Sequence, residues 1–192
     1  DPGHRIGSLV VNPGGPGAPG TDYAAHADAA FRQPLLDRFD IVGFDPRGVG
    51  GSEPALSCMT GPELDTYLST DEMPDNAAQL ATVVRQGKFY ASRCEQNSRA
   101  LLPYVGTQNA ARDLDVLRAA LGQSRLTYLG KSYGTYLGTW YAQLFPHRVR
   151  ALVLDGAYPV RGENPLYPSL WRTGIAALST VCERASRCHG DA

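Results

Sequence analysis

Short, mostly apolar runs alternate along this chain with longer amphipathic stretches. Four such runs are bounded by turn residues and cover 6–11, 39–44, 126–129 and 149–154. Runs of this length and composition predict strands that are buried on both faces. Because helical stretches separate them, we expect βαβ units that build an α/β fold, a mostly parallel central sheet flanked by helices.

The stretches between the first strands differ in their helical character. Residues 22–38 predict a helix that is interrupted near Pro34, and residues 77–99 predict a second, longer helix. Between them, residues 53–76 are polar and predict irregular structure.

The second half of the chain carries clearer signals. A helix capped by Thr107 and stopped by Gly122 has apolar positions spaced by four, three and four residues: Ala110, Leu114, Leu117 and Leu121. Another helix follows Gly134 and ends at Pro146. Prolines then precede one amphipathic helix, expected over 169–185.

Composition narrows the choice of function. The net charge of -1 gives no electrostatic case for binding nucleic acid or an acidic membrane. No apolar run approaches the roughly 20 residues of a membrane span. The chain starts without the apolar core of a signal peptide, so we expect a cytoplasmic protein or a mature or trimmed form. We expect no cofactor and no metal, since Cys182, Cys188 and His189 offer at most three ligands.

The most informative segment, 126–138, contains G-x-S-x-G between a predicted strand and a predicted helix. At such a turn the serine backbone is strained and its hydroxyl projects from the sheet, which marks Ser132 as a candidate nucleophile. Gly130 and Gly134 are expected to pass close to other backbone. The N–H of Tyr133, at the start of the helix, can stabilise an oxyanion.

Two other interpretations of this segment were weighed. A glycine-rich turn without a catalytic role would show the same five residues. A phosphate-binding loop is rejected, because it needs a glycine five residues before Gly130, where Arg125 stands.

The glycine-rich loop 12–17 also follows a strand, and in such folds this loop supplies the second oxyanion donor. Pro13 and Pro16 lack an N–H, so the donor must be Gly14, Gly15 or Gly17. We favour Gly15, then Gly14, with a merely rigid turn as the alternative. The loop 45–52 is expected to be structural, fixed through hydrogen bonds of Asp45 and Arg47.

Three segments together resemble one known family: NPGGPG, FDIVGFDPRGVGGSEP, and YLGKSYGTYLG with RVRALVLDG. They resemble the secreted bacterial tripeptidyl-aminopeptidase group of the α/β-hydrolases, which is related to proline iminopeptidases. The resemblance implies a Ser–Asp–His triad that releases short peptides from substrates with free N-termini. By motif, Ser132 would be the nucleophile, with Tyr133 and the Gly14–Gly15 loop as oxyanion hole.

The implied function is therefore peptide-bond hydrolysis through an acyl-enzyme. An esterase or other small-molecule hydrolase on the same framework is the first alternative, because fold does not decide the substrate. A non-catalytic, hydrolase-like binding fragment is the second.

Members of this group have extra strands before the NPGGPG strand, and a lid and further strands after the core. We therefore expect residues 1–158 to form a core incomplete at both ends, and 159–192 to begin a lid. The order Ser132, Asp155, His189 matches a triad, but the stretch between the last two leaves no room for the missing strands. We expect the acid and base beyond Ala192, in the remaining C-terminal part of the same enzyme.

The remaining histidines, His4, His26 and His147, are expected to be structural or solvated. The four cysteines fit two disulfides in an oxidising compartment, or four unrelated buried thiols. Because the resemblance implies a secreted or cell-envelope protein, we expect Cys58 to pair with Cys94 and Cys182 with Cys188.

Overall fold

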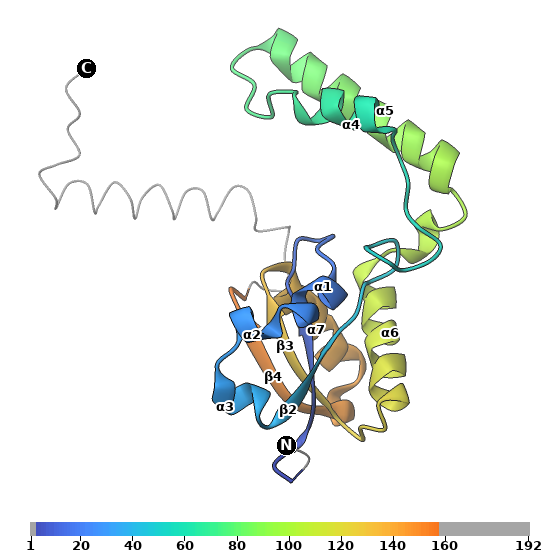
Figure 1. Cartoon of the computed structure of the whole chain (residues 1–192). Coiled ribbons are helices and arrows are strands. Elements are labelled where there is room, and N and C mark those ends of the chain that lie inside the picture. The colour runs from blue at the N-terminus through green and yellow to red at the C-terminus, as the bar shows by residue number, and fades with distance from the viewer. Residues whose placement is uncertain (1–2, 158–192) are drawn as a thin grey trace, which may run out of the picture. The chain divides into compact units, whose positions relative to one another are not determined.

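The computed structural model describes residues 3–157, which lie within one compact unit of the chain, Asp1–Ala157. Within these residues four strands form a parallel sheet in the order β2-β1-β3-β4 (Figure 1). The strands are β1 Gly7–Asn12, β2 Phe39–Gly43, β3 Leu126–Lys131 and β4 Val149–Asp155. The predicted parallel sheet is confirmed.

Several sequence expectations fall outside the described residues. They are the helix over 169–185, the lid segment 159–192, and the residues Cys182, Cys188 and His189.

The strand β1 is buried along its whole length because β2 and β3 pair with it on either side. Its last residue, Asn12, is level with Gly130 of β3. On the other side of β3, Lys131 is level with Asp155 at the end of β4. The loop after β1, the turn after β3 and the end of β4 therefore meet at one edge of the sheet.

Two groups of helices pack on the sheet (Figure 1). The short helices α1 Gly20–Ala25, α2 Ala27–Ala30 and α3 Gln33–Leu36 connect β1 to β2, with α1 and α3 packed on these strands. The helices α6 Thr107–Ala120 and α7 Tyr133–Leu144 pack on each other, and α7 packs on β3 and β4. Right-handed crossovers place the two groups on opposite faces.

The hydrophobic core lies between the sheet and the α6–α7 pair. Its buried residues are Val10, Ala110, Ala111, Leu114, Leu126, Tyr128, Leu137 and Tyr141. At its rim, Asp115 accepts hydrogen bonds from Arg118 at 2.9 Å and from the Tyr141 hydroxyl at 3.2 Å, and pairs with Arg148. Short 3₁₀ turns, η1 Leu102–Tyr104 and η2 Pro146–Arg148, lead into α6 and β4.

Two helix predictions need correction. The helix expected over 22–38, with an interruption near Pro34, is three short helices. The backbone leaves the helical region at His26 (φ −107°, ψ 31°) and again at Phe31 (φ −127°, ψ 148°), and this second break lies close to the predicted one. The helix α6 is capped by Gly106, and Thr107 is its first residue. The Thr107 hydroxyl is hydrogen-bonded elsewhere, to the Tyr133 hydroxyl at 2.9 Å.

The stretch 53–76, expected to be irregular, contains the helix α4 Gly61–Leu68. A capping box begins it, in which the Glu63 carboxylate accepts the Thr60 N–H at 2.9 Å. Pro62 lies in the first turn, where it has no N–H to leave unpaired. The predicted helix over 77–99 is confirmed as α5 Ala77–Ser98, and Asn76 caps it.

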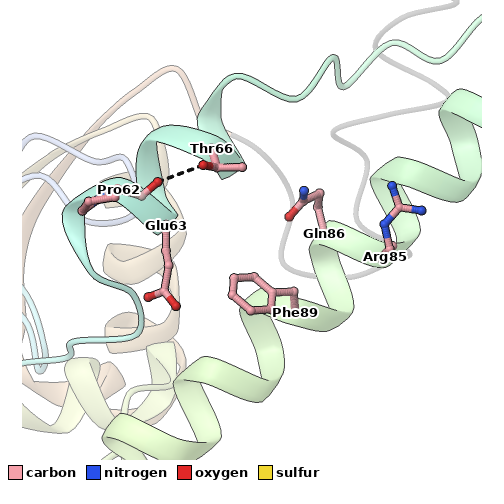
Figure 2. A pocket seen from close by; sticks show the side chains of 6 residues that line it. All are labelled: Pro62, Glu63, Thr66, Arg85, Gln86 and Phe89. Carbon is pink, nitrogen blue, oxygen red and sulfur yellow. Dashed lines mark hydrogen bonds between the residues drawn. The ribbon is translucent and has the colours of Figure 1, made fainter.

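The helices α4 and α5 face each other across an open hollow of about 500 Å³ (Figure 2). The Arg93–Glu63 ion pair, at 3.0 Å, and the stacked rings of Tyr67 and Tyr90, 5.2 Å apart, hold the pair together. The hollow is lined by Pro62, Glu63, Thr66, Arg85, Gln86 and Phe89. None of the described helices is long and apolar enough to cross a membrane.

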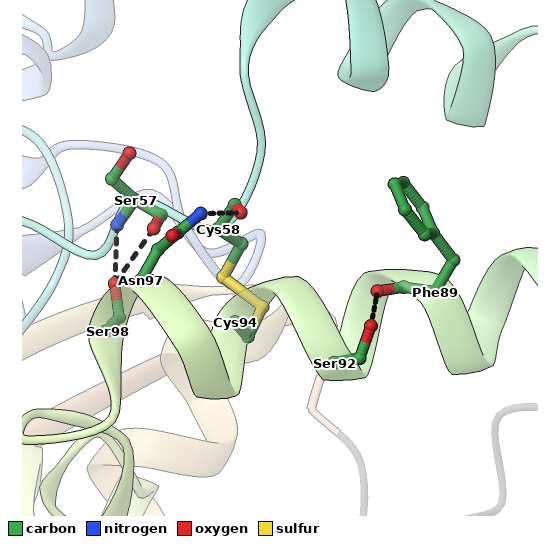
Figure 3. The surroundings of a disulfide bond; sticks show 7 residues. All are labelled: Ser57, Cys58, Phe89, Ser92, Cys94, Asn97 and Ser98. Carbon is green, nitrogen blue, oxygen red and sulfur yellow. Dashed lines mark hydrogen bonds between the residues drawn. A yellow bond between two sulfur atoms is a disulfide. The ribbon is translucent and has the colours of Figure 1, made fainter.

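The predicted Cys58–Cys94 disulfide is present (Figure 3). Beside it, the Ser98 hydroxyl accepts the N–H of Ser57 and donates to its carbonyl, both at 3.0 Å. The Asn97 side chain donates to the Cys58 carbonyl at 2.7 Å. The two ends of the α4–α5 segment, residues 57–58 and 94–98, are therefore joined to each other, and the chain enters and leaves the segment at this one cross-linked junction.

The loop 45–52 has the structural role expected of it. The Asp45 carboxylate accepts the N–H of Thr21 at 2.9 Å and the N–H of Gly51 at 2.8 Å. Burial raises the pKa of Asp45, but these hydrogen bonds outweigh it and the net pKa is lowered. Arg47 forms a bidentate ion pair with Asp113 of α6, at 2.6 and 2.8 Å.

Removal of the disulfide is expected to destabilise the protein. The bridge joins residues 36 positions apart, and closing a loop of this length is worth about 3–4 kcal/mol through the entropy of the unfolded chain. The double variant Cys58→Ala/Cys94→Ala should lose that much in urea unfolding under non-reducing conditions. In dithiothreitol the variant and the unsubstituted protein should coincide; a difference that persists there would assign the effect to packing.

Asp45→Asn is expected to lower the free energy of unfolding by about 1–2 kcal/mol at pH 7, because it weakens hydrogen bonds to a charged acceptor. A carboxyl with a lowered folded pKa stabilises above its unfolded pKa, about 3.9, and this contribution fades as pH falls through the folded value. The deficit should therefore shrink below pH 4 in thermal melts. Asp65→Asn, on the exposed side of α4, is the matched control and should show neither effect.

Candidate active site

Ser132 occupies the sharp turn between β3 and α7. Its backbone has φ 51° and ψ −122°, and within residues 3–157 it is the one non-glycine residue with positive φ. Such a conformation costs on the order of 1–3 kcal/mol and persists only where its surroundings enforce it. The residue is exposed, so its hydroxyl is accessible at the sheet edge.

Hydrogen bonds hold this turn from both sides. The Ser132 N–H donates to the carbonyl of Asp155 on β4 at 2.9 Å. The Ser132 carbonyl accepts from the N–H and the hydroxyl of Thr135, at 2.9 and 2.7 Å. The strained residue is therefore tied to the neighbouring strand and to the first turn of its own helix.

Gly130 and Gly134 lie in close backbone contact, as expected. A Cβ on Gly130 would overlap the carbonyl of Gly134, and a Cβ on Gly134 would lie 2.7 Å from the carbonyl oxygen of Asn12. The buried Tyr128 hydroxyl also donates to the Gly134 carbonyl at 2.8 Å. Only glycine lets the helix start this close to β1 and β3.

The loop after β1 lies directly against the serine turn. A Cβ on Gly14 would lie 2.5 Å from the Lys131 carbonyl oxygen and 3.0 Å from Ser132 Cβ. The buried side chain of Asn12 accepts the Gly14 N–H at 3.0 Å. The N–H of Gly14 is thus already engaged, whereas the N–H of Gly15 donates to no acceptor within residues 3–157.

The N–H of Tyr133, at the first position of α7, also has no acceptor in the described part of the chain. Its phenol is hydrogen-bonded to Thr107, and burial raises the pKa of Tyr133, so the phenol is neutral at physiological pH. Lys131 lies beside Tyr23, with Nζ 5.4 Å from the ring centroid. The Tyr23 hydroxyl, and to a smaller extent Asp155, raises the pKa of Lys131 and keeps its ammonium charged.

The described histidines lie away from this edge of the sheet. His4 precedes β1 and His147 precedes β4, so each is separated from the Ser132 end by a strand of six or seven residues, roughly 20 Å. The exposed ring of His26 contacts its own helix, with Nδ1 2.9 Å from the Asp22 carbonyl oxygen. Asp155 meets Ser132 through its backbone carbonyl, and its side chain is exposed.

No group of three or more His, Cys, Asp or Glu side chains within residues 3–157 is placed to hold a metal ion.

Comparison with protein families matches residues 7–184 to the family described as alpha/beta hydrolase fold. This match spans most of the chain and agrees with the parallel sheet and the strained serine turn. The chain belongs to the α/β-hydrolase family.

The relatives of this chain include proteins named as peptidases and a protein named as an esterase. Serine protease Hip1 of Mycobacterium tuberculosis is 45% identical over 156 residues, which cover 81% of this chain and 30% of that protein. The tripeptidyl aminopeptidase of Streptomyces coelicolor is 42% identical and covers 87% and 30%. Carboxylesterase B of Mycobacterium tuberculosis is 48% identical and covers 97% and 37%. The chain therefore spans about a third of the length of these curated relatives.

Sequence reasoning missed two residues that shape the site. Asn12 orients the Pro13–Gly14 peptide by accepting its N–H, and its only sequence signal is a polar residue at the end of a buried strand. Thr107 anchors the Tyr133 phenol, but as a hydroxyl residue near a helix start it resembles an ordinary cap.

Gly130→Ala is expected to destabilise the protein by more than about 2 kcal/mol, because the added methyl meets backbone that cannot move without breaking the turn. Gly87→Ala is the matched control: nothing lies within 4 Å of its Cβ position in α5, so alanine should stabilise by about 0.5–1 kcal/mol. Denaturant unfolding of both variants measures the contrast. Equal stability of the two variants would contradict the close contact.

Proposed function

We propose that this chain supplies the nucleophile and the oxyanion hole of a serine hydrolase that cleaves peptide bonds through an acyl-enzyme. One observation carries the proposal: an exposed serine on an enforced, strained turn lies beside two backbone N–H groups without acceptors in the described part of the chain. Strain of this kind is retained where function needs it.

In the proposed reaction the Ser132 Oγ attacks the scissile carbonyl while a base takes its proton. The carbonyl oxygen gains negative charge, and the N–H groups of Gly15 and Tyr133 stabilise it. We prefer Gly15 over Gly14 as the loop donor, because the Gly14 N–H already donates to Asn12. Water then releases the acyl group from Ser132 in the second half of the reaction.

We assign the base and the acid to parts of the enzyme outside residues 3–157. His4 and His147 are too distant, and His26 contacts its own helix. Asp155 remains a weaker candidate for the acid, because the structure uses its backbone carbonyl and leaves its carboxylate exposed. The greater length of the relatives supports this assignment.

The proposed substrates are peptides with a free N-terminus, from which short peptides are released. The names of the relatives from Streptomyces coelicolor and Mycobacterium tuberculosis support a peptidase. Carboxylesterase B, at 48% identity, favours ester hydrolysis as a second candidate. We also propose a secreted or cell-envelope location, which the Cys58–Cys94 disulfide supports because such bonds persist in oxidising compartments.

Ser132→Ala in the intact enzyme is expected to lower kcat/KM by a factor on the order of 10³ or more, and to abolish labelling by a fluorophosphonate, because the nucleophile is lost. Ser92→Ala removes another serine hydroxyl, on α5, and should retain activity and labelling. Near-normal turnover by the Ser132 variant would refute the assignment. A folded protein that neither turns over nor is labelled at Ser132 would favour a binding module.

Matched substrates separate the two hydrolase candidates. A tripeptide anilide with a free N-terminus should be cleaved much faster than its N-acetylated form, because an exopeptidase recognises the charged amine. Similar rates for both forms, together with faster cleavage of p-nitrophenyl esters, would favour the esterase.

A further inference from the structure

A second hollow lies beside the serine turn, between the first turns of α6 and the outer face of α7. Its volume is about 380 Å³, and the residues that matter here are Thr107, Gln108, Asn109, Arg112, Tyr136 and Trp140. It adjoins the candidate oxyanion hole, because Thr107 in its wall is hydrogen-bonded to the Tyr133 phenol at 2.9 Å.

Tyr136 and Trp140 form one wall, and they continue a row of aromatic rings that starts at Tyr133, the residue after Ser132. Tyr133, Tyr136 and Trp140 are spaced by three and four positions, so they share one face of α7. Neighbouring ring centroids in this row are 6.3 Å apart in both pairs. All three residues are half-buried, while Leu137 and Tyr141 occupy the face that packs into the core.

The opposite wall is polar and carries one positive charge. Arg112 is exposed, and its guanidinium donates to the Asn109 amide oxygen at 3.3 Å. The arginines Arg47, Arg93, Arg118 and Arg148 each pair with a carboxylate, whereas Arg112 has no acidic partner within residues 3–157. Among the described residues, no Asp or Glu lines the hollow.

We propose that this hollow is a substrate subsite that binds a carboxylate of a peptide. Arg112 binds the carboxylate, and Tyr136 and Trp140 form the apolar wall. A guanidinium binds a carboxylate through two parallel hydrogen bonds, and aromatic faces pack on the adjoining aliphatic atoms. Gln108 adds an amide donor on the same side, whereas the Asn109 amide nitrogen already donates to the Tyr104 carbonyl at 3.2 Å.

The distance between the oxyanion donor and the hollow determines the length of peptide that can bind both. Tyr136 and Trp140 follow the Tyr133 oxyanion donor by three and seven residues, roughly 5–10 Å along the helix. One to three extended peptide residues span that distance. The subsite thus suits a short peptide whose carboxylate lies close to the scissile bond. The inference deepens the proposed peptidase function, but the binding itself can be measured without turnover.

Tryptophan fluorescence provides the test. Trp140 lies in the wall of the hollow, and Trp140→Phe provides the matched background: the emission change that this variant loses reports on the hollow. The titration uses the intact protein with Ser132→Ala added, which prevents consumption of the ligand. The ligands are trialanine and trialanine amide, which share a free N-terminus and differ only at the C-terminal carboxylate.

Trialanine should change the emission saturably. Arg112→Gln should weaken trialanine binding by about tenfold or more, because it removes a charge-assisted, hydrogen-bonded pair. Arg112→Lys keeps the charge and should lose less. Arg125→Gln, at an exposed arginine immediately before β3, is the control and should bind as before. Trialanine amide should bind weakly, and equally with or without Arg112.

Equal affinity for the acid and the amide, no saturable change, or the same loss in Arg125→Gln would overturn the subsite. Failure of the peptidase proposal gives a different pattern. In that case Ser132 is not labelled by the fluorophosphonate, while the dependence of trialanine binding on Arg112 persists.

Discussion

The site rests on one steric constraint: strand β3 becomes helix α7 within a single residue, while the helix start lies against β1. The turn tolerates no side chain at Gly130 or Gly134, and it forces Ser132 to a positive φ. Strain on the order of 1–3 kcal/mol is offset by three hydrogen bonds to Ser132, each worth about 0.5–1.5 kcal/mol. The close approach of the α7 start to β1 also leaves the Ser132 hydroxyl at the sheet edge and directs the first N–H of α7 toward it.

Structural features that depend on residues close together in the chain could be predicted from the sequence, whereas features that depend on residues far apart could not. The four strands and the serine turn were predictable, because short apolar runs and flanking glycines are local signals. The helix α4 was missed because its signal is a capping box rather than apolar periodicity. The stretch 22–38 breaks at Phe31, close to the interruption predicted near Pro34, and also at His26, where the sequence carries no Gly or Pro to signal a break.

Within the candidate site the same distinction applies. Gly14 and Gly15, in the loop after β1, both fit the role of oxyanion donor by sequence. The side chain of Asn12 distinguishes the two candidate donors, because it accepts the N–H of Gly14 and not that of Gly15. The partnership of Thr107 with Tyr133 likewise joins residues 26 positions apart on two helices, which no local pattern encodes. Orientation of a buried side chain is decided by the assembled fold.

The cross-linked junction of the α4–α5 segment has a consequence for how this protein tolerates change. Because residues 57–58 and 94–98 are joined by a disulfide and three hydrogen bonds, the chain leaves and re-enters the core almost at one point. A peptide-bond break anywhere between residues 59 and 93 leaves the two fragments covalently attached. Insertions, deletions or exchange of the helices in that interval likewise do not alter the path from β2 to α6. The segment is thus a module that can diverge independently of the core that the sheet and its flanking helices form.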